Sequence, residues 1–193
     1  MSTEDQSTQQ LTDELVRMSH GNIDRVRELV GVHPGLVNAR ASWNEAPIEA
    51  AAHCGQREIA ELLLNAGADL DICTAAMLGN VEQVSEMLQQ NPDLAHATGA
   101  HGIPVLFFAA LSGNVSIAEV LHRRGSSVNA GEGGAMPLHA AATFGYLEMA
   151  EWLIANGAKI DAPGYNGRTP LALAIDAGHD EVADLLRQRG GES

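Results

Sequence analysis

Short segments with hydrophobic residues at helical spacing recur along this chain, and each ends close to a glycine. In residues 148–154 the apolar side chains fall on one face and the acidic ones on the other, which predicts an amphipathic helix. The alanine-rich segment 137–144 before it begins with a proline and stops at Gly145. Proline suits the first position of a helix, and glycine readily adopts the left-handed conformation that ends one. The pattern therefore predicts a pair of short helices followed by a turn.

Copies of this pattern follow one another along the chain, four of them with the sequence Ala-Ala-x-x-Gly and two degenerate ones at the ends. They close at Gly21, Gly55, Gly79, Gly113, Gly145 and Gly178. Successive glycines are therefore 34, 24, 34, 32 and 33 residues apart. A period of about 33 residues indicates stacked helix pairs, because a lone pair cannot bury its apolar face. We predict an all-α solenoid of six helix-pair units.

The repeats fill residues 11–190, which we expect to form a single domain. Residues 1–10 are polar and lack the apolar stretch of a signal peptide, so we expect a disordered tail there. Residues 191–193 are expected to form a second, short tail.

Three short motifs in the repeats resemble those of the ankyrin repeat family: residues 169–171 (Thr-Pro-Leu), 137–139 (Pro-Leu-His) and 67–71 (Gly-Ala-Asp-Leu-Asp). The resemblance implies an ankyrin-type solenoid whose short β-hairpin loops project as a row of fingers. It also implies that the two residues before each glycine line a concave face, and that His139 makes hydrogen bonds to a loop. Proteins of this family bind other proteins, so the resemblance implies a protein-interaction module that uses the finger loops and the concave groove.

Between Gly55 and Gly79 the period is about nine residues short, although both helices are present. We therefore expect the hairpin between the second and third units to be missing. The gap would be a notch with walls at residues 40–45 and 98–103, above His53, Cys54, Met77, Leu78, Leu111 and Ser112. The alternative is a neutral deletion in a tolerant loop.

Several large side chains stand where a partner would make contact. A contiguous exposed apolar patch usually marks a contact site, although these residues could instead be ordinary core beneath a neighbouring loop. Aromatic residues in loops are frequent binding anchors, with packing across the base of the next finger as the alternative. The predicted partner-binding residues are Trp43, His53, Met77, Leu78, His101, Leu111, Phe144 and Tyr165.

One group of side chains at the notch leaves an enzymatic interpretation open. Glu49, His53, Cys54 and His101 could provide a nucleophile, a base and its orienting partner. Adjacent helical residues point about 100° apart, however, so His53 cannot easily serve Cys54. Catalysis is therefore not favoured, and the alternative function is a small-molecule or enzymatic pocket that uses His53, Glu49 and His101. The histidines at helix ends, His20 among them, are expected to be solvated.

The composition narrows the range of partners. The chain has 11 basic and 25 acidic residues and a net charge of −14, which disfavours nucleic acid and anionic membranes and favours a basic protein surface. No apolar run approaches the roughly 20 residues of a membrane span. The two cysteines, Cys54 and Cys73, form no Cys-x-x-Cys pair, so we expect no metal site, no cofactor and no disulfide, and a reducing cytoplasmic location. A monomer is expected.

Overall fold

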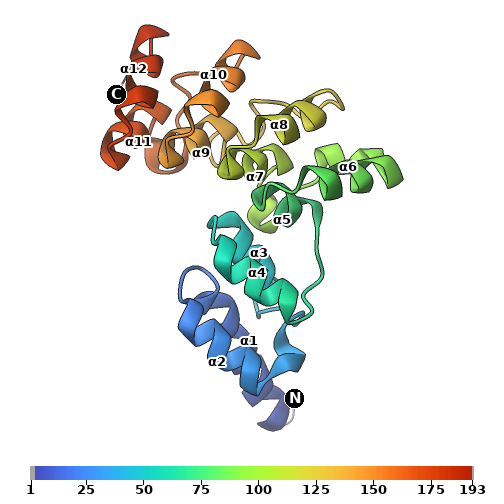
Figure 1. The fold of residues 1–193 in the computed structure, drawn as a ribbon. Helices are drawn as coiled ribbons and strands as arrows, with labels where there is room; N and C mark the ends of the chain where they lie inside the picture. The colour runs from blue at the N-terminus through green and yellow to red at the C-terminus, as the bar shows by residue number, and fades with distance from the viewer. Residues whose placement is uncertain (1–2, 193) are drawn as a thin grey trace.

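The computed structural model describes residues 3–192, which form an arc of stacked α-helices (Figure 1). Twelve α-helices and four short 3-10 helices, η1 to η4, lie in this range. The α-helices are α1 (Thr3–Met18), α2 (Ile23–Val32), α3 (Pro47–His53), α4 (Arg57–Asn65), α5 (Ile72–Met77), α6 (Val81–Gln90), α7 (Val105–Ser112), α8 (Val115–His122), α9 (Pro137–Phe144), α10 (Leu147–Ala155), α11 (Pro170–Ala177) and α12 (Asp180–Gln188). The all-α solenoid that the repeats predict is confirmed.

The helices pack in two rows. The inner row consists of α1, α3, α5, α7, α9 and α11, in which each helix contacts the next, and each inner helix also packs on the outer helix that follows it. The outer row runs through α6, α8, α10 and α12, while α2 packs on α4. Between α4 and α5 the chain passes through the extended residues 68–71, and the arc bends there (Figure 1).

Local caps explain where the helices begin and end. Asn22, Asn80 and Asn114 each accept a hydrogen bond from a backbone N–H in the first turn of an outer helix, which satisfies a donor that has no partner within the helix. Pro47, Pro137 and Pro170 occupy the first position of inner helices, as the sequence predicts. Glycines in the left-handed conformation end α7, α9 and α11.

The repeated glycine has a second function, which is to let neighbouring units approach closely. A Cβ atom at Gly113, where φ is +69°, would lie 2.8 Å from the ring of Tyr146 in the next unit. At Gly145 it would lie 2.5 Å from the ring of His179. Any other residue at these positions would therefore both strain the backbone and clash with the following unit.

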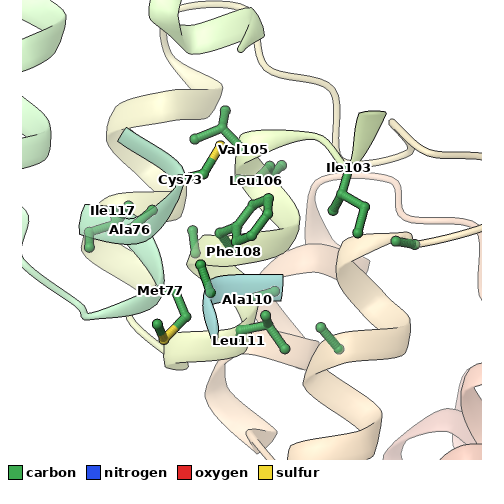
Figure 2. Packing of buried hydrophobic residues seen from close by; sticks show 14 of the residues in the cluster. Cys73, Ala76, Met77, Ile103, Val105, Leu106, Phe108, Ala110, Leu111 and Ile117 are labelled. Atoms are coloured by element: carbon green, nitrogen blue, oxygen red, sulfur yellow. The ribbon is translucent and has the colours of Figure 1, made fainter. Parts of the chain in front are cut away.

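The core lies between the inner helices and is built largely from alanine. Both alanines of all four Ala-Ala-x-x-Gly copies are at most 1% exposed. Larger side chains fill the spaces around them, and Figure 2 shows how Cys73 and Met77 of α5 pack near Phe108 and Leu111 of α7. Small residues at the contact allow the short helices to pack closely, which fits the aromatic-poor composition.

The expectation of a disordered tail at the start of the chain is wrong for the residues that the structure describes there. The polar residues 3–10 are not disordered but form the start of α1, where the Gln9 amide donates to Asp13 Oδ1 and to the carbonyl oxygen of Arg40. Residues 1, 2 and 193 lie outside the described range, whereas Gly191 and Glu192 follow α12 as irregular chain, with the Glu192 N–H donating to Asp161.

The finger loops, which we define as residues 41–45, 99–103, 131–135 and 164–168, are turns and not β-hairpins. Three of them are closed by one 2.9 Å hydrogen bond from the N–H of the first residue to the carbonyl oxygen of the fifth. The described residues contain no strand, only an isolated bridge between Thr98 and Pro104. The chain on either side is too short to form a ladder, because the inner helix begins two residues after each loop.

In the described range no helix combines the length and the apolar character that a membrane crossing requires.

His139 makes the loop contact that the resemblance implies. Its side chain is buried, and its Nε2 lies 3.2 Å from the carbonyl oxygen of Arg168 in the last finger loop. Burial lowers the pKa of His139 below its ordinary value of 6.5, and hydrogen bonds to backbone carbonyls act in the opposite direction.

The lowered pKa of His139 predicts a loss of stability in mild acid. Below the unfolded pKa of 6.5 the unfolded chain binds a proton at His139 that the folded chain does not, so stability is present above that pH and falls beneath it. Between about pH 7.5 and about pH 5.5, urea denaturation should show a larger loss of unfolding free energy for the wild type than for His139→Gln. Equal losses in the two proteins would contradict this assignment.

Candidate functional site

A hollow of about 360 Å³ opens on the inner side of the arc, between the inner helices and the finger loops. We call it the concave hollow. Its exposed aromatic side chains are Tyr165, at 60%, and Phe144, at 41%. The hollow reaches from the last finger loop back to the end of α3, because the Phe144 ring extends to Gly55, where an added Cβ would lie 3.3 Å from it. Of the predicted partner-binding residues, the fold brings together His53, Leu111, Phe144 and Tyr165 in its lining.

A second hollow, of about 580 Å³, occupies the predicted notch. Its walls include Arg40 and Asn44 on one side and residues 98–101 on the other, as the short repeat predicts. Its floor differs from the prediction, since it consists of residues 70–73 with Met87 and Leu94 and not of the C-terminal ends of inner helices. Each finger loop precedes an inner helix, so a missing loop uncovers the N-terminal end of α5.

Three of the predicted contact residues have no large exposed surface. Met77 and Leu111 are 2% and 6% exposed, and Leu78 is half-buried. The interpretation of Met77 as an exposed contact is wrong, because α5 packs against both α3 and α7. Leu111 forms part of the floor of the concave hollow.

Glu49, the proposed carboxylate of an enzymatic pocket, is fully engaged in structural contacts. The Arg40 guanidinium binds both of its oxygens, at 2.6 and 3.1 Å, and these hydrogen bonds raise the pKa of Arg40. Glu49 Oε2 also accepts the N–H of Ala46 at 3.0 Å. Glu49 therefore ties the first finger loop to the start of α3 and is not a free general base.

The buried carboxylate near the histidines is Glu45. It is the fifth residue of the first finger loop, and its side chain is only 4% exposed. Its Oε2 accepts the indole N–H of Trp43 at 2.7 Å. The Trp43 ring is itself held by the Arg17 guanidinium, 5.2 Å from the ring centroid, so Trp43 packs across the end of α1 while staying 40% exposed.

Three histidines from different segments surround the other oxygen of Glu45. His53 Nδ1 lies 3.2 Å from Oε1, His101 Nε2 lies 3.5 Å from it, and His20 Nε2 lies 4.0 Å from it. Nevertheless, Oε1 accepts no hydrogen bond. The His53 ring stands edge-on to the other two, with centroids 5.0 Å from His20 and 5.2 Å from His101. We call Glu45, His20, His53 and His101 the histidine cluster.

The missing finger brings this cluster together. With no loop between the first and second fingers, the short helix η3 (Ala100–Gly102) of the second finger contacts α3 directly. His101 therefore reaches Glu45, which belongs to the preceding finger. His101 has a left-handed backbone, with φ +58°, as does Asn166 at the same place in the last finger loop.

Burial dominates the electrostatics beside the cluster. It lowers the pKa of His53, against the opposing charge of Glu45, so burial favours the neutral imidazole. Burial raises the pKa of the neighbouring Cys54 thiol, and the negative charge of Glu45 acts in the same direction. A protonated thiol is a poor nucleophile, so the geometry does not support cysteine catalysis.

Reasoning from sequence placed His53 and His101 close together but missed two members of the cluster. His20 was expected to be solvated, and Glu45 was only a residue of a notch wall. The available signal was a histidine within the two residues before the closing glycine in two consecutive units, His20 before Gly21 and His53 before Gly55. Within the described residues, ligand atoms of Glu45, His53 and His101, and likewise of His20, His53 and Cys54, lie within 4.8 Å of one another.

Comparison with known proteins identifies the repeats. A family model described as ankyrin repeats (3 copies) matches residues 72–164 and 106–192, and a single ankyrin repeat model matches residues 44–75. Cyclin-dependent kinase 4 inhibitor B of Bos taurus is 31% identical over 135 residues, which are 68% of this chain and 100% of the relative. Cyclin-dependent kinase inhibitor 2A of Homo sapiens is 32% identical over 124 residues, 62% of this chain and 77% of the relative. The nuclear factor NF-kappa-B p105 subunit of Gallus gallus is 26% identical over 192 residues, 90% of this chain and 20% of the relative.

The hydrogen bond from Trp43 to Glu45 predicts a measurable contribution to stability. Trp43→Phe keeps an aromatic ring but leaves a buried carboxylate oxygen without its donor, so the unfolding free energy should fall by about 1–3 kcal/mol. Urea denaturation measures the change. Trp152→Phe is the matched control, since in the described part of the chain Trp152 packs edge-on against His122 and its indole N–H makes no hydrogen bond. Losses of the same size in both variants would show that ring size, and not the hydrogen bond, matters.

Proposed function

Because this chain belongs to the ankyrin repeat family, we propose that it is a protein-interaction module that binds its partner in the concave hollow and between the finger loops. The names of two of its relatives describe inhibitors of cyclin-dependent kinases, which act on another protein. A third relative is a subunit of NF-kappa-B. The names of the relatives thus point to protein partners, but not to the same partner.

The observation that carries this proposal is the pair of exposed aromatic side chains at the concave hollow. Phe144 is stacked on Tyr146, with centroids 6.1 Å apart and planes 10° apart, and its exposed edge lines the hollow. Tyr165 lies against Gly134 of the neighbouring finger loop, where an added Cβ would be 3.3 Å from its ring. Both rings are therefore held in place before a partner arrives, which lowers the entropy lost on binding.

The shape and the charge of the surface suggest what kind of partner fits. Aromatic side chains in a hollow often contribute a large part of the binding free energy, and they commonly pack against an apolar side chain of the partner. The net charge of −14 favours a partner with a basic surface around that side chain. We therefore propose a partner that inserts an apolar residue into the hollow from a basic surface.

The double variant Phe144→Ala, Tyr165→Ala tests the proposed site. Truncation of two anchor residues should cost about 2 kcal/mol each, so capture of a partner from host lysate should fall more than about tenfold. Quantitative mass spectrometry of captured proteins gives the measurement. Val32→Ala is the control, because Val32 is 66% exposed on α2, outside the hollow, and its loss should leave capture unchanged.

The proposal fails if the double variant, shown by circular dichroism to be folded, captures the same proteins as the wild type. It also fails if Val32→Ala reduces capture as strongly, since the contact would then lie on the outer helices.

A further inference from the structure

In the histidine cluster, one oxygen of the buried Glu45 carboxylate has no hydrogen-bond donor. Glu45 Oε1 accepts no hydrogen bond, although its side chain is 4% exposed and imidazole nitrogens of His53, His101 and His20 surround it. A buried charge of this kind requires a positive charge beside it. We propose that the cluster binds a divalent transition-metal ion, with zinc as the expected ion, between Glu45 Oε1 and the imidazole nitrogens.

The distances suit a four-coordinate ion. Zinc bonds of about 2.0–2.1 Å in a tetrahedral site place the ligand atoms about 3.3–3.4 Å from one another. Glu45 Oε1 lies 3.2 Å from His53 Nδ1 and 3.5 Å from His101 Nε2, so two of the distances already match those between ligands of one ion. Ligand atoms of all three residues lie within 4.8 Å of one another. His20 Nε2 lies farther away, 4.0 Å from Oε1, so Glu45, His53 and His101 are the expected protein ligands.

The ligand types select the class of metal. Imidazole nitrogen with one carboxylate oxygen suits zinc and its first-row neighbours, whereas calcium and magnesium prefer sites made of oxygen. The Cys54 sulfur lies within 4.8 Å of ligand atoms of His20 and His53, which form a second group of possible ligands. Both ligand sets share His53, which places the ion beside that side chain.

Neighbouring contacts orient the ligands. The Trp43 indole N–H holds Glu45 Oε2, which leaves Oε1 directed at the histidines. His20 Nδ1 lies 3.0 Å from the carbonyl oxygen of Val16, and donation there leaves Nε2 with its lone pair toward Glu45. His53 Nδ1 lies 3.0 Å from the carbonyl oxygen of Glu49, so ligation by this nitrogen exchanges a hydrogen bond for the metal bond.

A bound ion would connect parts of the chain that are far apart in sequence. His20 follows α1, Glu45 lies in the first finger loop, His53 ends α3 and His101 lies in the second finger loop. The ion would therefore hold the second finger against the first, across the place where a finger is missing. Metal binding there does not require that the concave hollow bind a partner.

The decisive experiment is calorimetric titration of the EDTA-treated chain with Zn²⁺. We expect one ion per chain in the wild type and an affinity at least about tenfold lower in His101→Asn. Asparagine tolerates the left-handed backbone of this position, as Asn166 does in the last finger loop, so the variant removes the imidazole and keeps the loop. His96→Gln, which changes an exposed histidine outside the cluster, should bind zinc like the wild type.

Two further measurements separate the cluster from other causes. Co²⁺ in place of Zn²⁺ should give the visible absorption bands of a four-coordinate site, and Mg²⁺ should give no heat of binding. Should His101→Asn misfold by circular dichroism, Glu45→Gln replaces it, since it keeps the side-chain size and removes the charge. The proposal is overturned if the folded variants bind zinc as tightly as the wild type, or if His96→Gln weakens binding equally.

Discussion

The close approach of consecutive inner helices is the constraint on which the rest of this structure depends. Fully buried alanine pairs let the helices pack closely, and two of the closing glycines, Gly113 and Gly145, admit a side chain of the next unit. Tyr146 fills the space where Gly113 lacks a Cβ, and His179 fills the space at Gly145, so the last two units each have a defined register on the one before. The position of every finger loop follows from that register, since each loop leads directly into an inner helix.

One deletion in this regular array creates the unusual site. Where the finger between the second and third units is missing, η3 contacts α3, and His101 meets Glu45 across the gap. On the inner face, the Phe144 ring lies against Gly55, the glycine that closes the unit three places earlier. A neutral loss of a loop would leave only an open notch. Here His101, which lines the notch, also lies beside the buried carboxylate of Glu45, and a buried carboxylate is costly for a fold to retain without a charge partner.

The fold could be predicted from sequence because its signals are local. Glycine spacing, proline at the first helical position and alanine pairs all act within one unit, whereas the site depends on contacts between units. Stacking of α1 on α3 brings His20 beside His53, and the fold of the first finger loop brings Glu45 to both. Met77 was misassigned for the same reason, since only the packing of α3 and α7 on both sides of α5 decides its burial. Residues 3–10 were expected to be disordered because they are polar, and their composition does not show that Gln9 donates a hydrogen bond to the carbonyl oxygen of Arg40.

The concave hollow and the histidine cluster share one side chain, and this links their behaviour. His53 lines the hollow and contacts Glu45, with its side chain 13% exposed. A partner bound in the concave hollow would therefore contact His53, the same side chain that an ion at the histidine cluster would coordinate. Binding free energies at two linked sites are reciprocal, so an ion that fixes His53 changes partner affinity by the same factor as the partner changes ion affinity.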